Sequence, residues 1–205
     1  MPLYRHDGTV VFYVHIPKTG GTSIERALRE AGAAEAFRFP GKRPFSKSSL
    51  QHMHAEVYTE AIGEGFYDYG FVIVRNPYNR FASEYRMKVV DAGDSEPAED
   101  WARACFDRFA EFAFTRDNHI RPQHEFIVDG LDVFRFEDGL EIPLKAACDR
   151  LGLEPPPSMP HAKRGSRTRI PISRAGRERI YGFYRADFDR YGYARDDFGD
   201  NVDVV

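Results

Sequence analysis

The same order of hydrophobic and polar positions occurs twice in the chain: an apolar run is followed by a short polar turn and then by an amphipathic helix. The first copy begins with residues 10–16, a run of strand-forming side chains typical of a central parallel strand buried on both faces. A turn with two glycines follows at 17–21. Thr22 and Glu25 have the spacing of a capping box and predict where the helix starts. Apolar residues then recur at helical spacing up to Gly32, namely Ile24, Ala27, Leu28 and Ala31.

The second copy begins with residues 71–74, an apolar strand that ends at Arg75. Asn76 and Pro77 are a favourable N-cap and first helical residue, so a helix is predicted to begin there. One face of that helix is apolar at Tyr78, Phe81, Ala82, Tyr85 and Val89.

The rest of the pattern predicts helices at 101–112, 143–151 and 173–187, a strand at 131–136 and a surface loop at 154–169. Strands that alternate with helices indicate an α/β fold. We expect a single domain over residues 1–205, with a central, mostly parallel β-sheet flanked by helices. In such a sheet the polar turns that follow the strands gather at one edge, where ligands bind.

Composition narrows the class of protein. The chain is 42% hydrophobic and 30% charged, as expected of a soluble globular protein, and its net charge of −3 gives no global basic field for nucleic acid. Charge is uneven, because 91–100 carries only acids while 161–179 is almost wholly basic. Cys105 and Cys148 lie in apolar helical patterns and are expected to be buried free thiols. With no apolar stretch of membrane-spanning length and no signal-peptide core, a cytoplasmic location is expected.

The turn at 17–21 has the properties of an anion site. The helix that follows offers backbone N–H groups and the positive end of its dipole, and two adjacent glycines allow close approach. Further donors come from its side chains, so the binding residues expected here are Lys18, Thr19, Gly20, Gly21, Thr22 and Ser23. The lysine precedes the glycines, which excludes the nucleotide triphosphatase pattern G-x-x-x-x-G-K-[ST].

The segment HIPKTGGTS resembles the 5′-phosphosulfate-binding loop of sulfotransferases that use 3′-phosphoadenosine-5′-phosphosulfate. It is most similar to the carbohydrate type, which includes the heparan sulfate 2-O- and 6-O-sulfotransferases and their short bacterial relatives. The segment FVIVRNPYNRFASEYRMK independently resembles the 3′-phosphate element of that family, with Arg75 and Ser83 at the family spacing. The resemblance implies the P-loop-like sulfotransferase fold, this donor nucleotide and no metal.

The resemblance also implies a general base between the two motifs, where the histidines are His52 and His54. Different branches of the family pattern select one or the other, and His52 is slightly favoured. Lys18 is expected to stabilise the leaving 5′-phosphate. Substrate-side residues are expected at His119, Arg121 and Gln123, and the basic loop is expected to contact the nucleotide through Arg164, Ser166 and Arg167.

These expectations describe transfer of a sulfuryl group to a hydroxyl acceptor, a saccharide or a glycolipid, without nucleic acid as a partner. Two other functions are compatible with the same loop. One is a nucleotide kinase or hydrolase, which would need a carboxylate and a hydroxyl arranged for magnesium. The other is a nucleotide-binding protein that has the fold but no catalysis.

Overall fold

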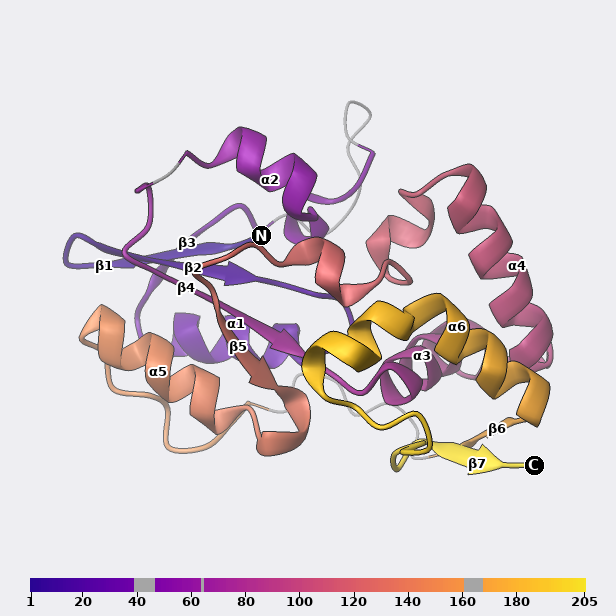
Figure 1. The fold of residues 1–205 in the computed structure, drawn as a ribbon. Helices are drawn as coiled ribbons and strands as arrows, with labels where there is room; N and C mark the ends of the chain where they lie inside the picture. The colour runs from indigo at the N-terminus through magenta and orange to yellow at the C-terminus, as the bar shows by residue number, and fades with distance from the viewer. Residues whose placement is uncertain (39–46, 64, 161–167) are drawn as a thin grey trace. The chain divides into compact units, whose positions relative to one another are not determined.

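The computed structural model of the chain describes residues 1–38, 47–63, 65–160 and 168–205. Its contacts divide it into two units, each made of two stretches of chain. The first unit comprises Met1–Val74 and Glu125–Lys163, and the second unit comprises Arg75–His124 and Arg164–Val205. Figure 1 labels the helices and strands of both.

The first unit contains a five-stranded sheet in the order β3-β1-β2-β4-β5. These strands are β1 (Leu3–His6), β2 (Thr9–Val14), β3 (Ala34–Ala36), β4 (Tyr69–Val74) and β5 (Asp132–Arg135). β2 and β4 pair in parallel, as do β4 and β5, so the predicted strands at 10–16, 71–74 and 131–136 are confirmed. The ends of β2 and β4 therefore lie at the same edge of the sheet.

The expectation of a mostly parallel sheet is wrong, because β1 pairs antiparallel with both β2 and β3. Asp7 and Gly8 connect β1 to β2 with φ angles of +44° and +89°. An Asp-Gly pair with positive φ at both positions is the preferred two-residue hairpin turn, and it returns the chain antiparallel. The sheet is therefore mixed.

Helices cover both faces of this sheet (Figure 1). Val11 and Tyr13 of β2 belong to a core formed with α1 (Gly21–Glu30) and α5 (Glu141–Leu151). On the other face, Phe12 contacts Tyr58 of α2 (Ala55–Ala61), with ring centroids 5.2 Å apart. β2 is thus buried on both faces, as its apolar run predicts. Short helical turns complete the unit at η1 (Leu50–His52) and η5 (Phe136–Asp138).

Helix α1 begins two residues earlier than the sequence pattern predicts. Its N-cap is Gly20, and within the described chain no side chain caps it, so the predicted Thr22–Glu25 capping box is wrong. The physical reason is that the Glu25 carboxylate is buried and bonded to His15 instead. The predicted end is confirmed: Gly32 has φ +103°, and the next N–H, of Ala33, donates to the Leu28 carbonyl.

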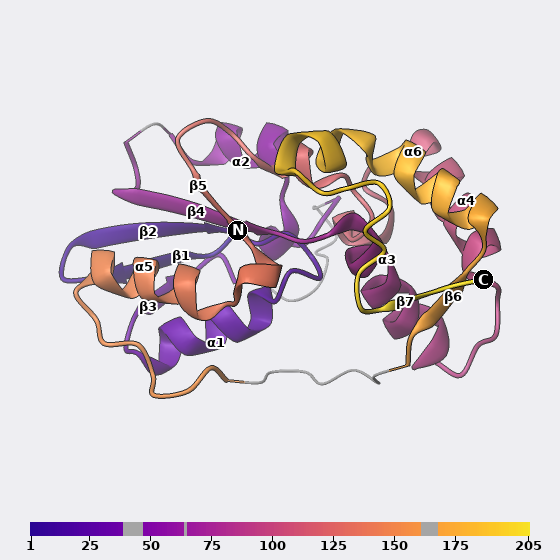
Figure 2. The same ribbon diagram turned by 60° about the horizontal axis from the view of Figure 1, so that its bottom comes forward.

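The second unit contains three long helices (Figure 2), and aromatic side chains make contacts between them. The helices are α3 (Pro77–Tyr85), α4 (Ala98–Glu111) and α6 (Arg174–Tyr191), with the turns η2 (Arg86–Val90) and η3 (Thr115–Asn118). The predicted start of α3 is confirmed, since the Asn76 side chain accepts from the N–H groups of Tyr78 and Asn79. A small parallel sheet joins β6 (Ile170–Ile172) to β7 (Val202–Val204). The turn η4 (Gln123–Phe126) leads from this unit into the first.

The predicted helices at 101–112, 143–151 and 173–187 are also confirmed: α5 ends at Leu151 with Gly152 as its C-cap, and α6 runs past the predicted end to Tyr191. Of the predicted surface loop at 154–169, residues 161–167 lie outside the described residues. Cys105 and Cys148 are buried free thiols, and burial raises the pKa of Cys105 to about 11. Among the residues that the structure describes, no helix has the length and apolar character needed to cross a membrane.

Candidate active site

The turn after β2 holds Lys18 in an unusual backbone conformation. Lys18 is partly exposed and has φ +72°, a left-handed conformation that costs a non-glycine residue about 1–3 kcal/mol. The next residue, Thr19, is buried, and its hydroxyl donates to the Ile16 carbonyl at 2.8 Å. This bond closes the turn from inside and helps to impose the strained conformation on Lys18.

Gly20 and Gly21 are required by the space around them. A Cβ on Gly20 would lie 2.7 Å from Leu140 Cδ1, and one on Gly21 would lie 2.2 Å from His15 Nε2. Thr22 and Ser23 follow on the first turn of α1, both partly exposed. The first N–H groups of a helix have no intrahelical acceptor and lie at the positive end of its dipole. The six residues of the predicted loop thus form one continuous turn at the start of α1.

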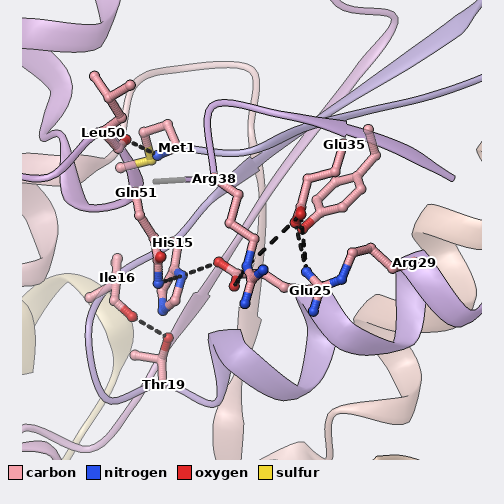
Figure 3. Close-up of polar contacts among 11 residues, drawn as sticks. Met1, His15, Ile16, Thr19, Glu25, Arg29, Glu35, Arg38, Leu50 and Gln51 are labelled. Carbon is pink, nitrogen blue, oxygen red and sulfur yellow. Dashed lines mark hydrogen bonds and ion pairs between the residues drawn. The ribbon is translucent and has the colours of Figure 1, made fainter. Parts of the chain in front are cut away.

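His15 and Glu25 form a buried pair beneath this turn (Figure 3). His15 Nδ1 lies 2.5 Å from Glu25 Oε1, and the two side chains are 5% and 1% exposed. Burial opposes ionisation of the Glu25 carboxyl, but its hydrogen bond to His15 and the charges of His15 and Arg38 outweigh burial and lower its pKa. An ionised carboxylate can only accept, so Nδ1–H donates and Nε2 is the nitrogen next to Gly21.

The pair continues into a network of charged side chains (Figure 3). Arg38 Nε lies 3.6 Å from Glu25 Oε2 and 3.9 Å from Glu35 Oε2. Glu35 in turn accepts hydrogen bonds from Arg29 at 2.9 Å and from the Tyr4 hydroxyl at 2.7 Å. Glu25 is therefore held by both His15 and Arg38, and Arg38 links it to Glu35.

The two candidate bases have different surroundings. His52 is partly exposed, and its ring meets the His15 ring edge-on, with centroids 5.1 Å apart. His54 is 1% exposed and occupies the N-cap position of α2, with Nε2 3.5 Å from Glu56 Oε2. The side-chain amide of Gln51, next to His52, lies 3.2 Å from His15 Nδ1. His15 thus contacts both Gly21 of the turn and His52.

The second unit contains the other predicted motif. Arg75 is partly exposed, and the buried side-chain amide of Gln123 brackets its backbone: Oε1 accepts from Arg75 N–H and Nε2 donates to Arg75 C=O, both at 2.8 Å. The Gln123 N–H donates to the buried carboxylate of Asp187 at 2.7 Å. Ser83 is partly exposed on α3. Gln123, predicted on the substrate side, here holds the backbone of Arg75.

His119 is also backed by a buried carboxylate. Its Nδ1 lies 2.7 Å from Glu84 Oε2, and the side chains of His119 and Glu84 are 16% and 1% exposed. Arg80, buried on α3, donates to the carbonyls of His119 and Arg121 at 2.9 Å. The α3 side chains therefore hold the segment that carries His119.

Arg121 is buried, and its guanidinium donates to Asn118 Oδ1 at 3.1 Å and to the Ala113 carbonyl at 2.9 Å. It thereby braces a strained turn, because Arg116, Asp117 and Asn118 have φ angles of +50°, +55° and +62°. Three consecutive left-handed residues other than glycine need such support from their surroundings. The remaining predicted residues, Arg164, Ser166 and Arg167, lie outside the described residues.

Comparison with known proteins decides the family. A model of the sulfotransferase family matches residues 2–194 of the chain. The chain belongs to the sulfotransferase family. Transfer of a sulfuryl group is thus the general reaction of the protein. No curated protein and no solved structure matches the chain.

The main feature of this sulfotransferase that the sequence pattern missed is the His15–Glu25 pair. Glu25 lies between Ile24 and Leu28 on the buried face of α1, where an ionised carboxylate requires a partner. That position was a usable signal, but the Thr22–Glu25 spacing offered a simpler local explanation.

Substitution of Gly21 tests the fit of His15 against the turn. Gly21→Ala is expected to destabilise the sulfotransferase by about 1–3 kcal/mol, since the new methyl group would overlap the His15 ring. Gly63→Ala is the matched control, because a Cβ there meets nothing within 4 Å. Urea unfolding of the two variants measures the difference, and equal stabilities would contradict the described contact.

The ionised state of Glu25 predicts how the stability of the protein depends on pH. Glu25→Gln is expected to lower the free energy of unfolding by about 1–3 kcal/mol at pH 7, because the amide can still accept from His15 but has no charge. A lowered carboxyl pKa contributes stability above the unfolded pKa of about 4.3, and this contribution is lost as pH falls through the folded value. Urea unfolding from pH 3 to 8 should show the difference from wild type shrinking in acid; a constant difference would argue against an ionised Glu25.

Proposed function

We propose that this sulfotransferase transfers the sulfuryl group of 3′-phosphoadenosine-5′-phosphosulfate to a hydroxyl of a saccharide or glycolipid, with His52 as general base. The observation that carries the choice of His52 is its ring contact with His15, whose Nε2 lies where a Cβ on Gly21 would overlap it. Through His15, the partly exposed His52 is held next to the turn that is proposed to hold the group being transferred.

The turn fits a phosphosulfate in its chemistry. Gly20 and Gly21 remove side chains from the start of α1, and the N–H groups there can donate to anionic oxygens. Lys18, Thr22 and Ser23 add side-chain donors. The Thr19 hydroxyl is engaged with Ile16, so Thr19 is proposed to contribute through its backbone.

For the 3′-phosphate we propose Arg75 and Ser83, in agreement with the resemblance of their segment to the family element. The bracketing of Arg75 by Gln123 supports this role, because a fixed backbone limits the directions in which the guanidinium can point. A guanidinium and a hydroxyl are both suitable donors to one phosphate. The basic loop with Arg164, Ser166 and Arg167 is proposed to add contacts to the nucleotide.

In the reaction, the acceptor oxygen attacks sulfur in line with the sulfur–oxygen bond to the 5′-phosphate, and that bond breaks. Lys18 places a cation where the leaving phosphate gains charge. His52 takes the proton of the acceptor hydroxyl on a ring nitrogen, a task suited to a group that titrates near neutral pH. The protein otherwise contributes alignment of donor and acceptor.

On the acceptor side, we propose that His119 contacts the substrate, while Arg121 and Gln123 act by holding the backbone around it and around Arg75. A net charge of −3 provides no broad basic surface for a long polyanion. A neutral or weakly acidic saccharide or glycolipid suits this charge better.

Calorimetry with 3′-phosphoadenosine 5′-phosphate tests the donor site directly. The wild-type protein is expected to bind this nucleotide without magnesium, and Lys18→Ala and Arg75→Ala are each expected to weaken binding about 10- to 100-fold, because each removes charge-assisted hydrogen bonds. Arg26→Ala removes an exposed cation of α1 that is paired with Glu30, and should bind as wild type does.

Two results would overturn the assignment of the donor. A magnesium-dependent preference for ATP would indicate a kinase or hydrolase. Binding of neither nucleotide would favour a protein that has the fold without the catalytic function.

Turnover measurements on variants of His52 and His54 decide which of the two is the general base. The assay follows formation of 3′-phosphoadenosine 5′-phosphate from the donor, with a mixed panel of neutral and acidic oligosaccharides as acceptors. His52→Ala is expected to lower this rate about 100-fold or more, since a general base typically contributes that much. His54→Asn, which can still occupy an N-cap position, should stay within a few-fold of wild type. The reverse result would assign the base to His54, and no loss in either variant would remove both.

A further inference from the structure

The sequence beyond the family match forms a defined structure in the second unit. The match ends at residue 194, and we call residues 195–205 the C-terminal segment. This segment includes β7, which pairs with β6, and Figures 1 and 2 both show it alongside α3. Within the family match, α3 is the helix that carries Ser83, one of the residues proposed for the 3′-phosphate.

The first part of the C-terminal segment contacts the start of α3. The Asn76 side-chain amide donates to the Asp197 carbonyl at 2.9 Å, while its oxygen caps the helix. The Tyr78 hydroxyl donates to the Arg195 carbonyl at 3.1 Å, and its ring lies edge-on to that of Phe198 with centroids 5.2 Å apart. The helix start that follows Arg75 is therefore held by this segment as well as by its own cap.

Asn201 makes the central contacts. Its backbone N–H and its side-chain amide both donate to Asn79 Oδ1 at 3.0 Å, and its side-chain oxygen accepts from Arg86 Nη2 at 3.1 Å. Asn79 and Arg86 lie four residues before and three residues after Ser83, which are the spacings of neighbours on one helical face. Asn201 thus binds two of the helical neighbours of Ser83.

The same residue connects α3 to the strand that follows the basic loop. Ile170 N–H donates to the Asn201 carbonyl at 2.8 Å, and Arg86 donates to the Thr168 carbonyl at 2.6 Å through Nη2. Gly199 sits so close to α3 that a Cβ would lie 2.2 Å from Asn79 Nδ2. The close approach shows that the segment is fitted to this face of α3 rather than merely covering it.

We infer that the C-terminal segment positions the 3′-phosphate-binding element, with Asn201 as the positioning residue for Ser83 and for the residues that follow the basic loop. Asn201 acts through Asn79, Arg86 and Ile170, without touching the nucleotide itself. The inference rests on the proposed 3′-phosphate role of Arg75 and Ser83. It adds that residues outside the family match help the protein to distinguish nucleotides with a 3′-phosphate from those without one.

The test compares two nucleotides that differ in the 3′-phosphate alone. Calorimetry is performed on the full chain with 3′-phosphoadenosine 5′-phosphate and with adenosine 5′-monophosphate. Asn201→Ala is expected to weaken binding of the first about tenfold, since several hydrogen bonds that orient the site are lost, and to leave binding of the second unchanged. A general loss of folding would weaken both alike.

Two further variants keep the test decisive. Asn201→Asp retains the acceptor for Arg86 but loses the amide donor to Asn79, so a folded protein with an intermediate effect is expected. Val204→Ala is the matched control, because Val204 lies in the same segment and 54% of the residue is exposed. Thermal unfolding of each variant checks that it is folded.

The outcomes separate this inference from the proposed function. An unchanged ratio of the two affinities in folded Asn201→Ala and Asn201→Asp, with the ratio still lowered in Arg75→Ala, would overturn the inference alone. Equal effects of Asn201→Ala and Val204→Ala would also overturn it. A wild-type protein that does not distinguish the two nucleotides would overturn the proposed 3′-phosphate element and the inference together.

Discussion

The hydrogen bond between His15 and Glu25 is the interaction on which the turn at 17–21 and the contact with His52 both depend. It joins the end of β2 to the buried face of α1, and its burial makes either group costly without the other. Because the Glu25 carboxylate accepts a hydrogen bond from Nδ1–H, the ring has one orientation, with Nε2 next to Gly21 and an edge-type contact with the ring of His52. The strained Lys18 turn and the candidate base are thus built on the same anchored imidazole. This arrangement resembles the way in which carboxylates orient histidines elsewhere in proteins, with the carboxylate acting through the ring it holds.

In the second unit, too, buried polar side chains hold the residues around them in place. Buried polar groups there hold backbone: Gln123 brackets Arg75, Asp187 accepts from Gln123, and Arg80 binds two carbonyls of the segment that carries His119. A buried polar group must be bonded, and a bonded group fixes its partner, so such networks give precise geometry to exposed loops. Arg75, Ser83 and His119 are partly exposed, and they are the side chains proposed above to contact ligands. The strain of three successive left-handed residues before His119 is compatible with this rigid support.

Much of the fold followed from local pattern. Continuous apolar runs marked β2 and β4 because a strand between two helical layers has no polar face, and helix ends were marked by Gly32, Gly152 and the Asn76–Pro77 pair. The mixed sheet was missed although the Asp7–Gly8 pair is a hairpin signal, because β1 is only four residues long and shows no long apolar run. The capping box was missed for another reason: a local spacing competes with a longer-range partner, and the spacing alone cannot show which of them Glu25 takes.

The sequence by itself predicted the three parallel strands, the main helices and the two motifs proposed to bind phosphate, since these depend on side chains that are close together along the chain. It also named the family, which the match over residues 2–194 bears out. Only the tertiary structure decided which polar side chains meet across the chain: His15 with Glu25 and His52, Gln123 with Arg75, and Asn201 with Asn79 and Arg86. Such pairings depend on the packing of elements far apart in sequence, where burial removes water as an alternative partner and makes one arrangement of hydrogen bonds far more stable than the rest.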